Sequence, residues 1–251
     1  MIIIGLAGQA NSGKNEVASY LAAHYGFVQF AFSDALYHEV QQAFGIENQD
    51  LLRDRATKDA PTLQLSMDNC SDLEFRELIT CPGYMKESPQ LTDEGYLNSD
   101  PLSPRQILQW WGTEYRRAQD PNYWVKRAAE FVTQMHYLPP YPELRPALFV
   151  ECGTRFENER EWIKADRSYD SECGNGEWSA EWQGNIWHIH RDATDQMTDT
   201  HASAKPLPVL PGEREIFNNS SIEHLHLAVD MLLSTTNQFV RCEPMEPTEV
   251  R

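Results

Sequence analysis

The residues most suited to chemistry form a glycine-rich turn near the N-terminus. Residues 8–15 read Gly-Gln-Ala-Asn-Ser-Gly-Lys-Asn, after an apolar run at residues 1–6 and before a stretch with helical spacing. Gly8 and Gly13 permit a tight turn whose backbone N–H groups can line a phosphate chain, and Lys14 can reach the β- and γ-phosphates. The segment therefore predicts a P-loop that binds a nucleoside triphosphate. A glycine-rich turn without a ligand is less favoured, because both flanks fit.

The metal ligand of this turn departs from the usual pattern. A hydroxyl normally follows the lysine and binds Mg²⁺ directly, whereas Asn15 offers a neutral amide oxygen on a longer side chain. The metal is expected at Asn15, through a water molecule, or at Ser12 or Glu16 instead. The expected nucleotide contacts in this segment are Gly8, Asn11, Ser12, Gly13, Lys14, Asn15 and Glu16.

Short apolar runs alternate with stretches of helical spacing along the chain, which predicts an α/β fold with an about five-stranded parallel sheet flanked by helices. The expected strands are residues 2–6, 27–32, 147–152, 185–191 and 215–218. The main helices are expected at 15–25, 35–44, 123–135 and 221–233, with two more that begin near 104 and 158. Because ligands bind at the carboxyl ends of parallel strands, Asp34, Arg155 and Arg191 are expected to converge with Lys14.

One domain with insertions, residues 1–240, is the simplest organisation for 251 residues. The polar and turn-rich residues 46–104 are expected to form a substrate-side insertion, and residues 168–184 a loop or hairpin. Residues 191–212 form a polar crossover, and residues 241–251 a flexible tail. Ser103 and Pro104 are expected to open a helix. Its apolar face would be formed by Ile107, Leu108, Trp111 and Tyr115.

The composition excludes several classes of protein. No apolar run approaches the about 20 residues of a membrane helix, and no export signal follows Met1, so a soluble cytoplasmic protein without a membrane partner is expected. The formal charge of −17 repels polyanions and argues against a nucleic-acid partner. An odd number of cysteines without a C-x-x-C pair predicts free thiols; these are Cys70, Cys81, Cys152, Cys173 and Cys242.

Phosphoryl transfer depends on positive groups around the transferring phosphate. The arginine candidates are Arg105, Arg116, Arg117, Arg155 and Arg191. Structural roles remain open for these residues. Arg155 could pair with Glu157 or Glu159, and the arginines of the helix that begins near residue 104 could face solvent. Asp34 or Ser33 could cap the next helix, and one residue of the Trp110-Trp111 pair could line an acceptor-base pocket. For His188 and His190, structural roles are favoured over metal binding.

Several segments in a fixed order carry a resemblance to a known family. They are residues 8–14, Arg105-Gln106-Ile107-Leu108-Gln109 with Gly112-Thr113-Glu114, Tyr123-Trp124-Val125, residues 154–159 and residues 199–203. Together they resemble the deoxynucleoside monophosphate kinases of tailed bacteriophages, within the P-loop nucleoside monophosphate kinases. The resemblance implies a P-loop kinase fold with substrate-binding and lid insertions. It frames most of the chain, except residues 46–100 and 168–184.

The resemblance also implies roles for residues. Lys14 and the loop amides would hold ATP, Arg191 would belong to a lid in the 191–212 crossover, and Asn218 would lie near adenine. Catalysis would involve Lys14, Arg155, Arg191 and Asp34. The expected contacts to the acceptor are Ser33, Asp34, Arg105, Trp111, Gly112, Thr113, Arg116 and Arg155. Gly153 stands where the family commonly has an acidic residue, and Glu151 or Asp34 could replace it as a metal ligand.

The resulting hypothesis is a kinase that transfers the γ-phosphoryl group of ATP to a deoxynucleoside monophosphate with Mg²⁺, giving the diphosphate and ADP. The acceptor is already an anion, so no general base is required. Two alternatives are a P-loop kinase of a hydroxymethylated base in DNA, with Asp34 as base, and an inactive nucleotide-binding module, suggested by Asn15 and Gly153. The resemblance is also consistent with a homodimer.

Overall fold

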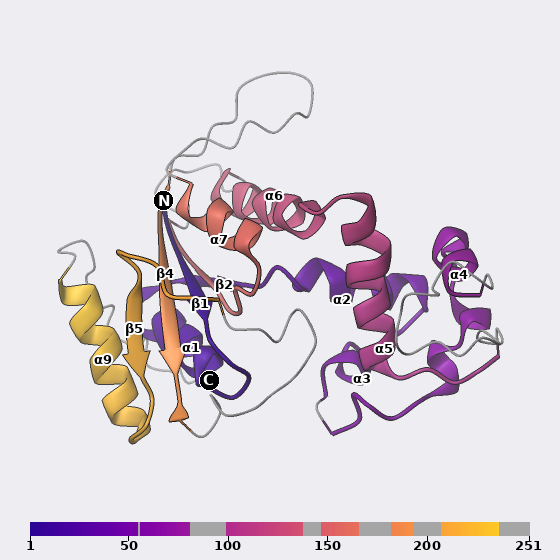
Figure 1. Ribbon diagram of the computed structural model, residues 1–251, viewed down its shortest axis with the longest axis horizontal. Helices are drawn as coiled ribbons and strands as arrows, with labels where there is room; N and C mark the ends of the chain where they lie inside the picture. Colours follow the sequence, from indigo (N-terminus) through magenta and orange to yellow (C-terminus); the bar gives the residue numbers. More distant parts are fainter. Residues whose placement is uncertain (55, 81–98, 138–146, 166–181, 193–206, 236–251) are drawn as a thin grey trace, which may run out of the picture. The chain divides into compact units, whose positions relative to one another are not determined.

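The computed structural model describes residues 1–54, 56–80, 99–137, 147–165, 182–192 and 207–235 (Figure 1). The chain divides into two compact units. Unit 1 comprises Met1–Phe32 with Arg127–Arg251, and unit 2 comprises Ser33–Lys126. The predicted tail and the 199–203 motif lie outside the described residues, as do nearly all of the 168–184 insertion and residues 193–206 of the crossover.

Unit 1 is built on a parallel sheet of five strands in the order β2-β3-β1-β4-β5. The strands are β1 (Ile2–Ala7), β2 (Val28–Phe30), β3 (Leu148–Glu151), β4 (Gln183–His190) and β5 (Arg214–Phe217). Apolar runs such as Ile2–Ala7 are typical of strands that are covered on both faces. The predicted α/β fold and its parallel sheet are confirmed.

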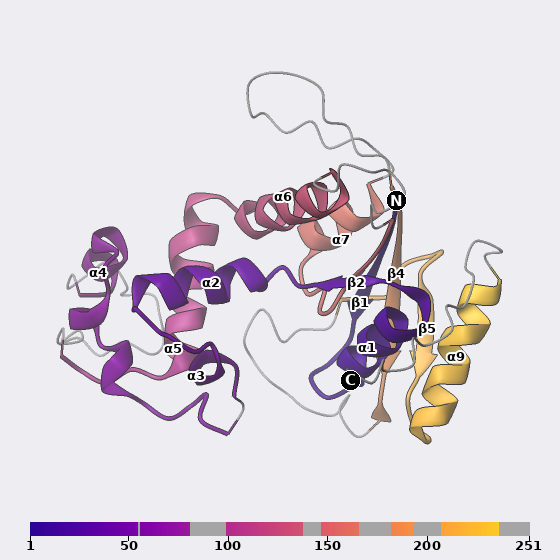
Figure 2. The same cartoon turned by 180° about the vertical axis from the view of Figure 1, so that it is seen from behind.

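Two helices cover one face of the sheet, α1 (Lys14–Tyr25) and α9 (Ile222–Ser234), and α9 lies beside β5 (Figures 1 and 2). Their buried side chains include Val17 and Val229, which belong to the same apolar cluster as Leu6 and Ile189 of the strands. The strand-helix order and the helical spacing predicted both elements, because each helix presents one apolar stripe to the sheet.

The opposite face carries α7 (Glu157–Lys164), which packs unusually close to the strands. A Cβ atom on Gly184 of β4 would lie 1.6 Å from the carbonyl oxygen of Ile163. Only glycine permits this approach. β4 begins at Gln183, so the last two residues of the predicted 168–184 insertion are part of the strand, where Gly184 pairs with Ile3 of β1.

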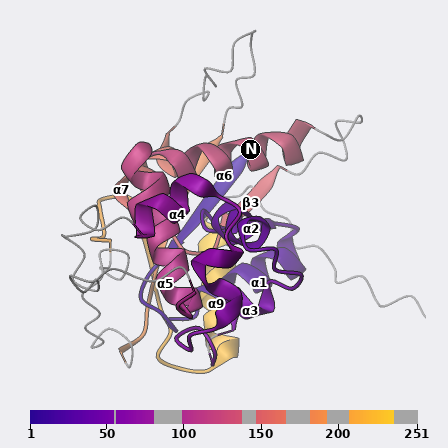
Figure 3. The same cartoon turned by 90° about the vertical axis from the view of Figure 1, so that its right-hand side faces the viewer.

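Unit 2 is helical (Figure 3). It contains α2 (Asp34–Ala43), α3 (Asp50–Arg53), α4 (Leu73–Thr80), α5 (Pro104–Gln109) and the start of α6 (Tyr123–Tyr137), with short 3₁₀ turns at Leu63–Leu65 and Met67–Asn69. Ser103 and Gln106 form a capping box at the start of α5, with Pro104 in the first turn. The predicted helix start at Ser103-Pro104 is therefore confirmed.

The predicted helix changes its winding after α5. Residues Trp110–Arg117 form a π-helix, in which hydrogen bonds join residues five apart. In an α-helix, residues five apart would point about 140° away from each other. The wider turn instead places Trp111 and Arg116 on the same face. Both Trp110 and Trp111 are buried.

Among the described residues, no helix combines the length and the apolar character needed to cross a membrane.

Candidate functional site

The turn between β1 and α1 has a backbone that favours glycine. Gly8 and Gly13 have φ values of +139° and +111°, and Asn11 is also left-handed at +65°. A Cβ atom on Gly8 would lie 2.3 Å from the carbonyl oxygen of Ile189. The two glycines are therefore required by their conformations, and Gly8 brings the turn against the end of β4.

The Lys14 ammonium group lies inside this turn. Its Nζ donates to the carbonyl oxygens of Gly8 at 2.8 Å and Gln9 at 2.6 Å. Lys14 also begins α1, whose N-cap residue Gly13 provides no side-chain cap. The first N–H groups of a helix lack intrahelical partners and carry partial positive charge. The turn thus combines an ammonium group with a helix N-terminus, an arrangement suited to anions.

Three predicted residues line the same turn. Ser12 is fully buried, and its Oγ has no hydrogen-bond partner among the described residues. Asn218 lies at the end of β5, and its Nδ2 donates to the Ser12 carbonyl oxygen at 2.8 Å. Arg191, directly after β4, donates to the Asn11 carbonyl oxygen at 3.4 Å. The structure therefore brings Arg191 and Asn218 together with the loop, whereas the predicted adenine contact of Asn218 stays a prediction.

The candidate metal ligands at the start of α1 differ in their surroundings. Asn15 is exposed. Glu16 Oε1 lies 2.8 Å from Nε2 of His226 in α9, and the His226 ring stacks on Tyr20. Within the described ranges, no group of three or more His, Cys, Asp and Glu side chains could hold a metal ion. A Mg²⁺ ion bound mainly by phosphates and water needs no such group.

Glu151 lies at the end of β3 and is fully buried. Its Oε2 accepts hydrogen bonds from Thr154 Oγ1 at 2.6 Å and from the Gly153 N–H at 2.9 Å. Burial, and then the nearby Glu159 carboxylate, raise the pKa of Glu151 from 4.5 to about 8. Glu151 pairs with Gly5 of β1. It therefore lies at the edge of the sheet where the turn between β1 and α1, which holds Lys14, begins. Its predicted role as a metal ligand stays a prediction, and a bound cation would have to displace the carboxyl proton.

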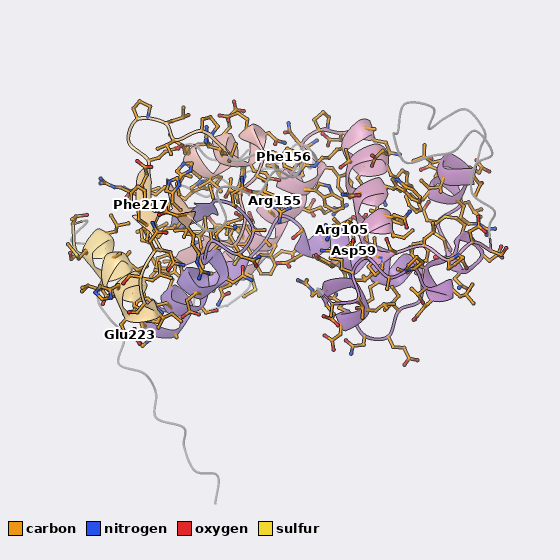
Figure 4. All side chains as sticks on the ribbon, turned by 60° about the horizontal axis from the view of Figure 1, so that its bottom comes forward. Asp59, Arg105, Arg155, Phe156, Phe217 and Glu223 are labelled. Carbon is orange, nitrogen blue, oxygen red and sulfur yellow. The ribbon has the colours of Figure 1, made fainter. Side chains whose placement is uncertain are left out.

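Arg155 lies between β3 and α7, where its side chain is exposed (Figure 4). The backbone N–H groups of Arg155 and Phe156 donate to Glu159 Oε2 at 2.8 and 3.1 Å. Glu159 therefore caps α7, and Glu157 pairs with Arg160. In the described part of the chain, the Arg155 guanidinium pairs with no carboxylate, so the alternative of an ion pair with Glu157 or Glu159 is not supported.

Unit 2 brings several predicted acceptor residues together around Glu39 of α2. Glu39 Oε2 accepts hydrogen bonds from Trp111 Nε1 and from Arg116 Nε, both at 2.9 Å. Glu39 Oε1 accepts a hydrogen bond from the Tyr123 hydroxyl at 2.6 Å. Gly112, within the π-helix, accepts a hydrogen bond at its carbonyl oxygen from Trp124, and the neighbouring Thr113 is exposed. These contacts gather the aromatic rings and Arg116 at one place in the unit.

The other predicted residues of unit 2 have local partners. Arg105 forms two hydrogen bonds with Asp59 (Figure 4). Asp34 pairs with Arg53 at 3.1 Å, and Ser33 is the N-cap residue of α2 but makes no side-chain capping bond. The predicted convergence of Asp34 with Lys14, Arg155 and Arg191 stays a prediction, because Asp34 belongs to the other unit.

Reasoning from the sequence missed Glu39 and Glu213. The Glu213 side chain is buried, and it pairs with His188 of β4 at 2.7 Å and with Arg160 of α7 at 3.3 Å. This network gives His188 the structural role that was favoured over metal binding. Neither glutamate carries a signal in the sequence, because each lies in a polar stretch and its partners are distant along the chain.

Comparisons with known proteins give the family. No protein-family profile matches the chain. A protein of Acanthamoeba polyphaga mimivirus, named "Putative deoxynucleotide monophosphate kinase", is 33% identical over 168 residues, which span 65% of this chain and 69% of the viral protein. An unliganded sugar kinase from Janibacter sp. HTCC2649 aligns with 93% of this chain and 95% of its own, at 12% identity and a TM-score of 0.35, which is too low to indicate a shared fold. By its identity to the viral protein and the share of that protein which it covers, the chain belongs to the same family and is a nucleotide kinase.

Proposed function

We propose that the protein transfers the γ-phosphoryl group of ATP to a deoxynucleoside monophosphate, giving the deoxynucleoside diphosphate and ADP. The observation that carries this proposal is the Lys14 ammonium group, held inside a glycine-dependent turn at the N-terminus of α1. The acceptor class is suggested by the name of the mimivirus relative. The more specific assignments to a bacteriophage group and to the P-loop family are part of the same proposal.

The residues of the turn fit a triphosphate. The uncapped helix N-terminus supplies N–H donors, and Ser12 Oγ is a buried polar atom without a described partner. Lys14 would exchange its two carbonyl acceptors for phosphate oxygens, which make stronger, charge-assisted hydrogen bonds. Mg²⁺, when bound with ATP, would neutralise phosphate charge. Asn15 and Glu151 are the residues that we propose to lie nearest to it, directly or through water.

The chain's own groups would act by positioning and by charge. Lys14 would hold the β- and γ-phosphates, and Asn218 would support the loop through Ser12. Arg191 and Arg155, which lie at the ends of β4 and β3, would balance charge that develops during transfer. An anionic acceptor needs no general base, so Asp34 would bind or position the acceptor rather than take a proton.

The first experiment is a coupled assay of ADP release with MgATP. Each deoxynucleoside monophosphate, each ribonucleoside monophosphate and hydroxymethylated duplex DNA is tested as the acceptor. Lys14→Ala removes the ammonium group, and Lys126→Ala, whose parent side chain is exposed and pairs with Asp120, is the matched control. We expect turnover with deoxynucleoside monophosphates that is lost in Lys14→Ala and kept in Lys126→Ala.

Other outcomes of this assay would contradict the proposal. Transfer only to DNA would indicate the DNA-base kinase, against which the charge of −17 already argues. Binding of ATP without transfer to any acceptor would indicate an inactive nucleotide-binding module. A cytoplasmic location and a homodimer stay predictions, which fractionation of infected or expressing cells and light scattering would test.

A further inference from the structure

Glu39 of unit 2 has no predicted role, although it contacts the predicted acceptor residues Trp111 and Arg116 of the π-helix. Only the Nε atom of Arg116 donates a hydrogen bond to Glu39, and the Arg116 side chain is 21% exposed. The two terminal nitrogens of Arg116 have no hydrogen-bond partner among the described residues, yet they are not sealed from solvent. They therefore form a planar fork of N–H donors, which is the geometry that recognises a phosphate or carboxylate by two parallel hydrogen bonds.

Aromatic rings fix the plane of this fork. The guanidinium carbon of Arg116 lies 4.4 Å from the ring centre of Tyr115, 5.2 Å from that of Tyr123 and 5.5 Å from that of Trp111. Tyr115 and Trp111 are buried, so their rings have little freedom to move. A guanidinium group held in this way loses little further rotational freedom when an anion binds, so the entropic cost of binding is small.

Glu39 connects the elements of this arrangement. Its carboxylate accepts hydrogen bonds from Trp111, Arg116 and Tyr123, which lie on the π-helix and at the start of α6. The pair of Trp111 and Arg116 can share one carboxylate oxygen only because the π-helix puts residues five apart on the same face. π-Helical turns are rare and are frequent at functional sites, which is a second indication that this face binds a ligand.

We propose that Glu39 is a positioning residue that aims the terminal nitrogens of Arg116 at the phosphate group of the acceptor nucleotide. This inference rests on the proposed function for the identity of the acceptor. Glu39 itself would not touch the acceptor, because two like charges would repel. Its effect would pass entirely through Arg116.

The direction in which Glu39→Gln changes the KM for the acceptor distinguishes the positioning role from a purely electrostatic or purely structural role. Glutamine has nearly the same shape but lacks the charge that strengthens the bond to Arg116. If Glu39 were only a negative neighbour of the site, its neutralisation would lower the KM for an anionic acceptor. If Glu39 positions Arg116, the KM for the deoxynucleoside monophosphate should instead rise about tenfold, with the KM for ATP unchanged. A purely structural role would lower the melting temperature and leave both KM values unchanged.

A double-mutant cycle with Arg116→Lys gives the decisive measurement. Lysine keeps the charge but cannot form the fork. If Glu39 acts through Arg116, Glu39→Gln should raise the acceptor KM in the parent protein and have little further effect in Arg116→Lys. Additive effects of the two substitutions would overturn the inference. The exposed pair Arg127 and Glu130 provides the matched controls Arg127→Lys and Glu130→Gln, which should change neither KM.

Calorimetric titration of a deoxynucleoside monophosphate without ATP separates this inference from the proposed function. Weaker binding in Glu39→Gln and Arg116→Lys, in a protein that shows no transfer, would keep the anion site and reject the kinase reaction. Turnover in the parent protein with unchanged binding in both variants would keep the reaction and reject the site. If Glu39→Gln fails to fold, Tyr123→Phe removes one donor from Glu39 and should raise the acceptor KM severalfold, whereas an unchanged KM would overturn the inference.

Discussion

Replacing Glu151 by glutamine tests whether the buried carboxyl group is neutral at physiological pH. Glu151 is completely buried, and burial followed by the Glu159 charge raises its pKa from 4.5 to about 8. Glutamine preserves the shape and an acceptor oxygen for Thr154 and Gly153, but it cannot ionise. The comparison of the two proteins therefore isolates the ionisation of this one group.

The sign and the size of the effect follow from linkage. A carboxyl group whose pKa is raised on folding stabilises the folded state fully below its unfolded pKa of 4.5, and this contribution is lost as the pH rises through about 8. A difference of 3.5 between these two pKa values corresponds to at most about 5 kcal/mol, at about 1.4 kcal/mol per unit. The parent protein should therefore lose stability relative to Glu151→Gln between pH 5 and pH 8.

Urea unfolding at several pH values, with a chelator to remove divalent cations, measures this difference. The free energy of unfolding of Glu151→Gln minus that of the parent protein should rise by several kcal/mol over the interval. The exposed Glu130→Gln is the control, and its difference from the parent protein should stay nearly constant. Parallel stability curves for Glu151→Gln and the parent protein would show that Glu151 is ionised throughout, and the reasoning from burial would be refuted.

Three further predictions concern the turn between β1 and α1, its neighbour Asn218, and Arg155. Gly8→Ala should abolish ATP binding in a calorimetric titration and destabilise the protein more than Gly26→Ala; Gly26 also has a positive φ but faces open space, so its substitution should cost only about 1–2 kcal/mol. Equal costs would mean that the close approach of Gly8 to Ile189 is unimportant. Asn218→Ala removes the hydrogen bond to the Ser12 carbonyl and should raise the KM for ATP about tenfold while leaving the acceptor KM unchanged, and a change in both would argue against a local effect. Arg155→Ala should lower kcat by about 100-fold with an unchanged melting temperature, because its guanidinium pairs with no described carboxylate; a lower melting temperature with a normal kcat would assign it a structural role.

The sheet was predictable because its strands carry local signals. A strand covered on both faces needs a continuous apolar run, and Ile2–Ala7 and Leu148–Glu151 provide such runs. The loop after β1 was equally predictable, since Gly8 and Gly13 are required by positive φ values rather than by distant contacts. The position of Arg191 beside this loop followed from the order of the elements, because parallel strands present their carboxyl ends at one edge. Asn218 was expected near the nucleotide only from the family resemblance.

The helical unit was less predictable because its chemistry depends on contacts between distant residues. Arg116 is separated from Glu39 by 77 positions and Arg105 from Asp59 by 46, and nothing in either local pattern identifies the partner. The spacing of Ile107, Leu108, Trp111 and Tyr115 correctly predicted a helix but not its widening after Gln109. The widening places Trp111 and Arg116 against Glu39 of α2, so it is a property of the folded unit and not of the helix alone.

Glu39 and Glu151 show how a carboxylate can be interpreted once its surroundings are known. Both side chains hold a carboxyl group away from bulk water. Burial of a carboxylate charge costs free energy unless hydrogen-bond donors stabilise the charge or a proton neutralises it. Glu39 has three donors, one of them a guanidinium group, and these hydrogen bonds hold Arg116 in place. Glu151 has polar donors but also a second carboxylate nearby, so it is held largely neutral without a cation. A cation brought by the nucleotide and bound by Glu151 would have to displace the proton of this carboxyl group. Binding of MgATP should therefore release a proton from the parent protein, and this release should disappear in Glu151→Gln.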